Sequence, residues 1–451
     1  MWWVVTARAG SIAGLGVPGA GGGFAGPAEP GAFGVAVSPT APMAATEPEL
    51  IVDLGVLGTR SRTLLDTWGE ALDKRGATPI PSLGFALPLG DFAIGAAFHV
   101  PYARAANGEP DGPQRFYGVT SSLRLLEQDL SLAVRPVAPV TLGAAVRVGE
   151  FTFSSHKAID TGAMLNASLA PDPALPVGDP LLEGSQSLAS IDDVVVSFVA
   201  GAALDVGRHH LVASFRPAWA TRGRGSVTFV PSTDFSAEIG GDVRVELVMP
   251  AQLDLAARLA LGPVVLHPEL QWVGWGRTGR NVAEVTSLEL TLPDPLLDGV
   301  LSSAGLDQAD FVTSQQGATE ADMHWHDVVN VGLAVSGQVS PSVELRAGGW
   351  YSPSAIEDDY VHSGNLDFTV IDLRAAGAVR FTDAIGVVGS LDVMPGFART
   401  ITTSQYSQTD PAAPPLALPV SNGVYDVDLW RAGLTVWVRF PTPTPAREEA
   451  T

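Results

Sequence analysis

Cysteine is absent from this chain of 451 residues. Its absence excludes disulfide bonds, thiolate metal sites and a cysteine nucleophile. The chain also lacks an uninterrupted apolar run of about 18 residues, so no membrane-spanning helix is predicted. Basic residues are scarce, with 26 lysines and arginines against 48 aspartates and glutamates. The net charge of −22 argues against nucleic acid as a partner, because phosphate binding requires a basic surface.

Apolar residues are nevertheless abundant. They make up 46% of the chain, and the mean hydropathy is +0.22. The 49 glycines and 35 prolines suit many strands joined by turns. High apolar content without a helical span indicates a β-barrel, whose lipid-facing residues alternate with polar ones.

The segment 430–440 illustrates this alternation. Trp430 and every second residue up to Phe440 are apolar, whereas Arg431 and Arg439 lie among the residues between them. Side chains on a strand point alternately to opposite faces, so one face of this segment is apolar and the other carries guanidinium groups. An apolar strand that ends on an aromatic residue near the C-terminus is typical of outer-membrane barrels.

A two-residue period recurs in fourteen segments, joined by connections that are alternately short and long. This sorting predicts an all-β fold: a transmembrane up-and-down antiparallel β-barrel of 14 strands over residues 49–440, with its tight turns at the periplasmic rim. The longest extracellular loops are predicted at 155–190 and 276–326. The segments are 50–62, 79–88, 91–102, 115–135, 140–154, 191–206, 209–229, 242–261, 263–275, 327–337, 341–352, 367–381, 384–396 and 425–440.

Both ends of the chain differ from the barrel in composition. Residues 10–48 are rich in glycine, alanine and proline, too apolar for a solvated tail, and are predicted to form an N-terminal hatch, or plug, inside the lumen. Residues 1–9 end in Ala7-Arg8-Ala9, which has the form of a cleavage site, so they are interpreted as residual signal peptide. Residues 441–451 are predicted to form a disordered periplasmic tail.

Polar residues between the apolar positions are predicted to line the lumen. On the segment 242–261 this assigns Val243, Val245 and Leu247 to the lipid-facing side and Arg244 and Glu246 to the lumen. A lumen arginine would suit a carboxylate head group, because its planar fork binds carboxylates bidentately. The alternative is a structural lattice with acids such as Glu344, Asp372 and Asp392. The candidate arginines are Arg147, Arg216, Arg346, Arg374 and Arg431.

The two longest loops are unusually rich in leucine. Loops that face water rarely carry so many apolar residues, so these could form the first binding surface for a hydrophobic ligand, or pack on each other to cap the barrel. The candidate capture residues are Leu165, Leu181, Leu182, Leu296, Leu297 and Leu301.

Catalytic and metal-binding patterns are weak. His324 and His326 lack a clear third ligand, so no metal site is predicted. No grouping of serine, histidine and acid stands out on the outer rim. We therefore expect no enzymatic activity and no cofactor.

Several local patterns in order resemble the FadL family, outer-membrane transporters of long-chain fatty acids that include the TodX-type aromatic hydrocarbon channels. Gly14-Leu15-Gly16 and the stretch up to Met43-Ala44-Ala45 are similar to the family's hatch. The stretch 85–91 (FALPLGD), running into Ile94-Gly95-Ala96 and Val100-Pro101-Tyr102, is similar to its second hairpin. The stretch 345–353 (LRAGGWYSP) also has a family counterpart.

The resemblance implies an outer-membrane channel for passive uptake of long-chain fatty acids or similar hydrophobic compounds. Family members release ligand sideways into the membrane at a kinked third strand, to which Gly95, Phe98 and Pro101 correspond here. Where the family hatch usually ends in Asn-Pro-Ala, this chain has Thr40, Ala41 and Pro42.

The expected partners are the hydrophobic ligand, membrane lipid and lipopolysaccharide, and the expected state is a monomer. The alternatives are an aromatic hydrocarbon importer of the same fold, a general porin and an outer-membrane lipid-modifying enzyme.

Overall fold

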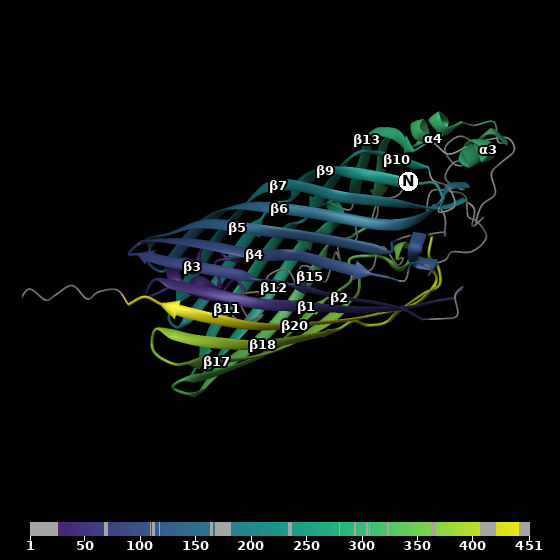
Figure 1. The fold of residues 1–451 in the computed structure, drawn as a ribbon. Coiled ribbons are helices and arrows are strands. Elements are labelled where there is room, and N and C mark those ends of the chain that lie inside the picture. The colour runs from purple at the N-terminus through teal and green to yellow at the C-terminus, as the bar shows by residue number, and fades with distance from the viewer. Residues whose placement is uncertain are drawn as a thin grey trace, which may run out of the picture.

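The computed structural model describes most of the chain as one closed antiparallel β-barrel of 14 strands (Figure 1). The described residues are 26–441, apart from gaps at 67–70, 109, 111–112, 117, 163–165, 167–181, 233–236, 279, 293–294, 304, 306, 323, 362–366 and 406–420.

Nine wall strands each form one uninterrupted element. They are β1 (Glu49–Leu65), β4 (Phe92–Asn107), β5 (Thr120–Val137), β6 (Val140–Asp160), β7 (Glu183–Val206), β16 (Val343–Ser352), β17 (Val370–Arg380), β18 (Ile385–Pro395) and β20 (Gly423–Arg439).

Five wall strands are each divided into two elements. The pairs are β2 (Ala71–Pro79) with β3 (Ser82–Leu89), β8 (His209–Arg216) with β9 (Trp219–Val230), β10 (Glu238–Met249) with β11 (Ala251–Leu261), β12 (Val264–Gly274) with β13 (Arg280–Leu292), and β14 (Gly317–Asp322) with β15 (Val328–Ser340). The short strand β19 (Arg399–Ile401) pairs with β20 beyond the end of β18.

The first and last strands close the barrel. β1 pairs with β20 without a register shift, from Glu49 opposite Arg439 to Leu65 opposite Gly423. Each of the fourteen predicted segments overlaps a wall strand, so the predicted fold class is confirmed. No helix in the described ranges is long and apolar enough to cross a membrane.

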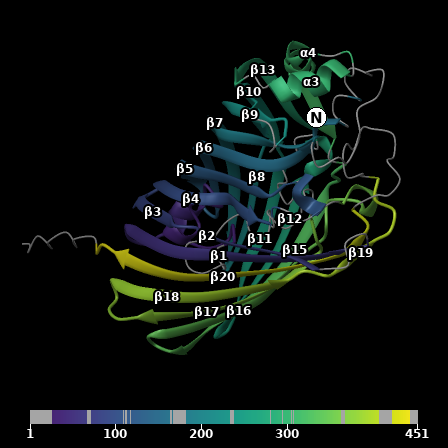
Figure 2. The same cartoon turned by 45° about the vertical axis from the view of Figure 1, so that its right-hand side comes forward.

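The two ends of the barrel differ. Tight turns lie at one end, called the turn end here, where Gly90, Gly207 and Gly262 have φ angles of +74°, +61° and +67°. This backbone region favours glycine. The helices α3 (Pro295–Ser303) and α4 (Gln308–Gln315) lie at the opposite end, the loop end (Figure 2). The short helices within the described residues are η1 (Gly31–Phe33), η2 (Ala41–Ala44), η3 (Pro113–Phe116), η5 (Trp275–Arg277) and η6 (Asp358–Tyr360).

The walls extend further towards the loop end than the alternation indicated. β6 and β7 reach Asp160 and Glu183, so both enter the predicted loop 155–190. β13 and β14 lie within the predicted loop 276–326 and pair with each other. These loop boundaries are therefore corrected to 161–182 and 293–316, and in the second loop the chain forms α3 and α4.

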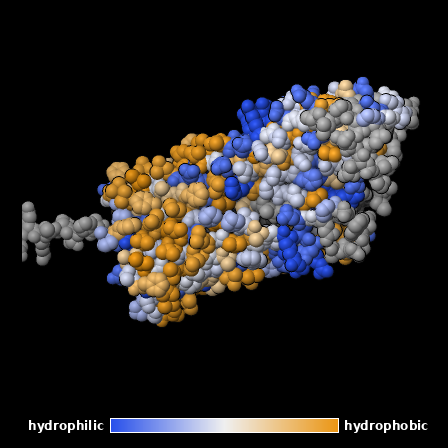
Figure 3. Space-filling view, in the orientation of Figure 1, coloured by the Kyte–Doolittle hydropathy of each residue, from blue (hydrophilic) through white to orange (hydrophobic). Residues whose placement is uncertain are grey.

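Wall polarity inverts along the barrel axis. Near the turn end of β20, Trp430 and Leu434 are exposed on the outer face and Arg431 and Thr435 are buried inside. Towards the loop end, Tyr425, Val427 and Leu429 are buried inside, and the outward residues between them are aspartates. Hydrophobic residues accordingly gather on the outer surface towards the turn end, and hydrophilic ones towards the loop end (Figure 3).

This inversion overturns one assignment made from sequence. Val243, Val245 and Leu247 of β10 are buried inside the barrel, whereas Arg244 and Glu246 lie on the outer face. β10 belongs to the part of the wall beyond the apolar belt, where the outer face is polar. Alternation predicted that these residues lie on two faces but could not identify the inner one.

The described part of the predicted hatch, residues 26–48, lies inside the barrel. η1 and η2 contact the inner side of β1, β3, β4 and β5. Met43 packs against inward Ala93 and Ala133, and the Ser214 hydroxyl donates to the Val37 carbonyl over 3.3 Å. Residues 1–9 and 442–451, with their predicted signal-peptide and tail assignments, lie outside the described residues.

Candidate functional site

The five candidate arginines all lie on the inner face, and each contacts a carboxylate. Arg374 on β17 donates from Nε to Asp372 Oδ2 over 2.5 Å. Arg431 on β20 lies 3.7 Å from Asp392 Oδ2. These two pairs form the structural lattice that was the alternative interpretation of the sequence; ligand contact by these arginines stays a prediction.

Two of the arginines also contact residues 26–48, the described part of the predicted hatch, called the hatch segment here. Arg346 on β16 donates from Nη1 to Glu29 Oε1 over 2.6 Å and from Nε to Glu344 Oε1 over 2.8 Å. Arg147 on β6 donates from Nη2 to the Ala36 carbonyl over 2.7 Å. Residues far apart in the chain thus fix the hatch segment to the wall at two places.

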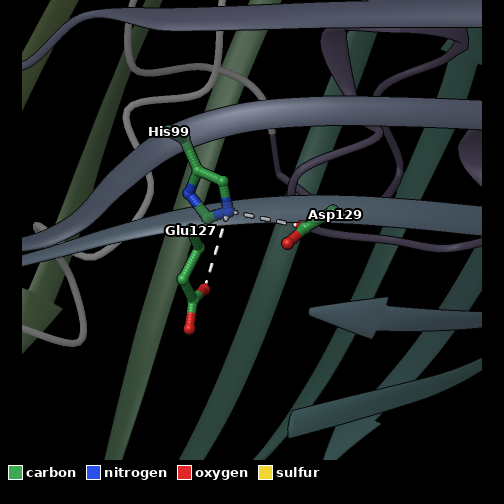
Figure 4. A group of neighbouring side chains, drawn as sticks. All are labelled: His99, Glu127 and Asp129. Atoms are coloured by element: carbon green, nitrogen blue, oxygen red, sulfur yellow. Dashed lines mark hydrogen bonds and ion pairs between the residues drawn. The ribbon is translucent and has the colours of Figure 1, made fainter. Parts of the chain in front are cut away.

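Arg147 and Arg216 belong to a buried charged cluster with His99 on β4 and Glu127 and Asp129 on β5, called the His99 cluster here. Arg147 Nε lies 3.1 Å from Asp129 Oδ2, and Arg216 pairs with Glu127. His99 Nε2 lies 3.3 Å from Asp129 Oδ2 and 3.6 Å from Glu127 Oε2 (Figure 4). All five residues are at most 5% exposed.

Sequence reasoning missed three members of this cluster. Glu127 and Asp129 are two residues apart on β5, so strand alternation puts them on one face, and His99 lies on β4, one of the two strands that pair with β5. The register of β4 against β5, which brings them together, was not readable from the sequence.

Three atoms of this cluster could hold a cation by distance alone. The ligand atoms of His99, Glu127 and Asp129 lie within 4.8 Å of one another. However, Arg147 contacts the same oxygens, Asp129 Oδ2 at 3.1 Å and Glu127 Oε2 at 3.6 Å. Two guanidinium groups already balance the two carboxylates, so a divalent cation would add uncompensated buried charge. The residues fit an ion-pair cluster better than a metal site.

An apolar cluster fills the interior towards the loop end. Its largest fully buried members are Trp275, Tyr425, Phe151, Phe229 and Phe368.

Two of the predicted capture residues, Leu182 and Leu301, belong to this apolar cluster and are 3% and 1% exposed. Leu165 and Leu181 lie outside the described residues, as do the side chains of Leu296 and Leu297 on α3.

The apolar cluster meets the His99 cluster at Arg216. Trp219 and Tyr102 are members of the apolar cluster, and the guanidinium carbon of Arg216 lies 5.2 Å from the centre of the Trp219 ring. The Tyr102 hydroxyl accepts a hydrogen bond of 3.2 Å from Gln252 Nε2. This boundary offers polar groups at the edge of an apolar interior, an arrangement typical of sites for amphipathic molecules.

The wall is interrupted between β4 and the strand formed by β2 and β3. β3 pairs with β4 only from Leu83 opposite Phe98 to Leu89 opposite Phe92, and the next pair is Arg75 opposite Asn107. In the described structure, no strand pairing bridges the interval between them. This interval is called the wall gap here.

A bulge in β4 lies beside the wall gap. The register of β4 against β5 shifts between His99 and Tyr102, which leaves Val100 and Pro101 in the bulge. Proline has no amide hydrogen to donate to a ladder. Leu57, Ile80 and Val100 pack together there as a small buried cluster.

The hatch segment contacts the predicted lateral-opening strand directly. A Cβ added at Gly95 of β4 would lie 2.5 Å from Pro42 Cγ, so glycine is required for this close approach. Thr40 and Ala41 are also buried, and the hydroxyls of Thr40 and Ser38 are 2.8 Å apart. The structure therefore brings together the predicted hatch residues and Gly95, while Pro101 lies further along β4 in the bulge and Phe98 faces outwards.

Comparison with known proteins identifies relatives of this fold. The family model described as outer membrane protein transport protein (OMPP1/FadL/TodX) matches residues 51–362. A search of curated proteins found no significant match.

Similar solved structures include three with nearly complete coverage. A Pseudomonas aeruginosa FadL homologue has a TM-score of 0.74 at 12% identity, covering 97% of this chain and 98% of its own. The Ralstonia pickettii toluene transporter TbuX has a TM-score of 0.65 at 13% identity, covering 94% and 97%. The Pseudomonas putida toluene transporter TodX has a TM-score of 0.66 at 14% identity, covering 96% and 98%.

The structures support the fold, and the family model matches most of the chain. The predicted family and outer-membrane location are both confirmed. The chain therefore belongs to the FadL/TodX family of outer-membrane β-barrel transporters of hydrophobic compounds.

Proposed function

We propose that the protein is a passive channel for long-chain fatty acids or similar hydrophobic compounds, which leave sideways into the outer membrane through the wall gap. One observation carries the proposal: the wall gap lies beside the bulge of β4, and the hatch segment packs on the same strand at Gly95. Movement of the hatch segment would therefore act on the strand that borders the gap.

The energetics of an apolar ligand favour this route. Each methylene group is more stable in hydrocarbon than in water by about 0.8 kcal/mol. Exit through the side of the barrel avoids carrying the ligand through periplasmic water. The small buried cluster beside the wall gap, Leu57, Ile80 and Val100, is apolar, so a hydrophobic ligand would meet apolar side chains there.

Capture at the loop end is part of the same proposal. Leu182 and Leu301 join the loops to the apolar cluster, which extends down to Arg216 and the His99 cluster. We propose that ligand enters between these loops and moves along the apolar cluster. Membrane lipid and lipopolysaccharide would surround the wall of a monomer, and no enzymatic step is included.

A reversible cross-link across the wall gap tests lateral release. The natural chain has no cysteine, so Ile80→Cys and Val100→Cys can be introduced and bridged with a short bis-thiosulfonate. The bridged protein should lose uptake of radiolabelled oleate in cells, and reduction should restore it. The matched control bridges Leu87→Cys and Ile94→Cys, which are paired partners in the regular part of the same strands. Unchanged uptake by the bridged gap variant would contradict lateral release here.

An aromatic hydrocarbon is the second candidate ligand. The apolar cluster contains Phe151, Phe153, Phe229 and Trp275, and ring-on-ring contacts would suit a small aromatic molecule. Mass spectrometry of ligands that co-purify with the protein separates the candidates. Fatty acids would support the first and aromatic compounds the second, whereas free permeation of sugars in liposome swelling would contradict both and favour a general porin.

A further inference from the structure

We propose that the binding interior selects uncharged hydrophobic molecules and excludes carboxylate anions, with the Glu127–Arg216 pair as a determinant of this specificity. The inference rests on the uptake function proposed above and specifies the charge of the ligand. A fatty acid would accordingly be bound in its protonated form, and alcohols, esters and hydrocarbons would be bound directly.

The first support is that the lumen arginines already hold internal carboxylates. Arg216, which borders the apolar cluster, pairs with Glu127, and Arg147 pairs with Asp129. The same holds for Arg346 with Glu29 and Glu344, Arg374 with Asp372, and Arg431 with Asp392. The charge of each guanidinium is therefore compensated before a ligand arrives.

The second support is that inward-facing carboxylates outnumber these arginines. Asp53 accepts a hydrogen bond from the Thr435 hydroxyl, and Asp254 accepts one from Gln271 Nε2. Neither carboxylate contacts an arginine within the described structure, and neither does Glu269 of β12. The interior thus holds more carboxyl groups than these arginines can pair with, and those that are ionised repel an incoming anion.

A carboxylate ligand has two unfavourable options in such an interior. It can stay unpaired in an apolar environment, or it can displace an internal carboxylate from its arginine and leave that group buried without a partner. Breaking a buried ion pair in this way corresponds to a loss in affinity of at least about 100-fold.

An uncharged polar head group meets a different environment. The Nε–H of Arg216 is buried and has no acceptor among the described residues, although Glu127 balances the charge of its guanidinium. A ligand hydroxyl or carbonyl oxygen could accept this hydrogen bond without adding charge. The Tyr102 hydroxyl lies at the same boundary and can donate as well. The alkyl part would lie in the apolar cluster.

A series of ligands matched in chain length tests the proposal. Binding of 1-dodecanol, methyl dodecanoate and dodecanoate to the full chain in lipid nanodiscs is measured at pH 8, with protein-free nanodiscs as the partition blank. We expect the alcohol and the ester to bind at least about 100-fold more tightly than dodecanoate. Equal affinity for alcohol and carboxylate would overturn the inference and leave the uptake function standing. Absence of binding by all three would overturn both.

A gain of function provides the sharper test. Glu127→Gln keeps the side-chain shape and removes the charge that compensates Arg216, while Asp129 still holds Arg147. Affinity for dodecanoate should rise at least about tenfold, and affinity for dodecanol should change little. The control is Glu246→Gln, the same charge change on the outer face beside Arg222, which should leave both affinities unchanged. A folded Glu127→Gln variant with unchanged carboxylate affinity would contradict the proposal.

Discussion

Single residues connect the hatch segment to the barrel wall. Glu29 is 6% exposed and shares Arg346 with Glu344. Arg147 holds the Ala36 carbonyl and Asp129 at the same time. Buried charges are costly without partners. Both of these contacts therefore hold the hatch segment and also give a charged residue of the wall a partner. Displacing the segment therefore has an electrostatic cost at these two places.

Glu29→Gln should loosen the hatch segment. The substitution removes the charge of residue 29 from its ion pair with Arg346, which retains Glu344. We expect the free energy that holds the hatch segment in place to fall by about 1–2 kcal/mol. The check is the labelling rate of Ala32→Cys by a small maleimide, which should rise several-fold. Glu344→Gln removes the other acid beside Arg346 without altering the hatch segment, and an equal rise in that control would refute the interpretation.

Gly95 should tolerate no larger residue, because Ser131 and Pro42 both lie against it. In Gly95→Ala the new Cβ would lie 2.4 Å from Ser131 Oγ and 2.5 Å from Pro42 Cγ, and overpacking of this kind lowers stability by about 1–3 kcal/mol. Urea unfolding in nanodiscs should show this loss, and Pro42→Ala in the same chain should recover part of it, as expected for residues in contact. Gly389→Ala, where no atom of the described residues lies within 4 Å of the added Cβ, is the control. Additive effects of the two changes would contradict a direct contact.

At the scale of strands, the position of each residue along the barrel axis decides which face is apolar. On β20 the apolar residues face outwards near the turn end and inwards near the loop end. β10 lies wholly in the second region. A strand with clear alternation can therefore be assigned correctly to the wall and incorrectly to a face.

Cysteine labelling distinguishes the two faces of β10. Glu246→Cys should react with a membrane-impermeant maleimide on intact cells, because its side chain lies on the outer face of the projecting wall. Val245→Cys is the matched neighbour, only 1% exposed and inside, and should react at least about tenfold more slowly. The reverse order of rates would place β10 as the sequence alternation first suggested.

How much of the structure the sequence predicts depends on how far apart in the chain the interacting residues lie. The two-residue alternation depends only on residues near one another in the sequence, so the fourteen segments and the inward direction of Arg431 were predictable. The contacts of Arg147 with Ala36 and of Gly95 with Pro42 join residues brought together only by barrel closure, and no local pattern encodes them. The His99 cluster depends in the same way on strand register.

At the scale of the whole molecule, the junction that closes the barrel lies close to the wall gap. The ladder between β1 and β20 is continuous over both strands, while the wall gap lies just beyond β2 and β3, the next wall strand after β1. The barrel is thus continuously paired at the junction of its first and last strands and interrupted one strand further on.

Restoring a backbone hydrogen-bond donor beside the wall gap should make the barrel more rigid. Replacing Pro101 with valine restores an amide donor in the bulge of β4, and we expect slower oleate uptake with unchanged or higher stability to urea. Pro341→Val, in a tight turn at the other side of the barrel, is the control for loss of a proline. Faster uptake by the Pro101→Val variant would show that the bulge does not limit release.

The wall gap also has a consequence for amide hydrogen exchange. Successive amides of a strand point to alternate neighbours, so on β4 between Val100 and Asn107 those directed towards β5 are hydrogen-bonded. Those directed towards β2 have no ladder partner in the part of the chain that the structure describes. Exchange with deuterium should therefore alternate from fast to slow along a single strand, while the amides of β1 facing β20 remain protected. This pattern of exchange would mark the wall gap even in the absence of ligand.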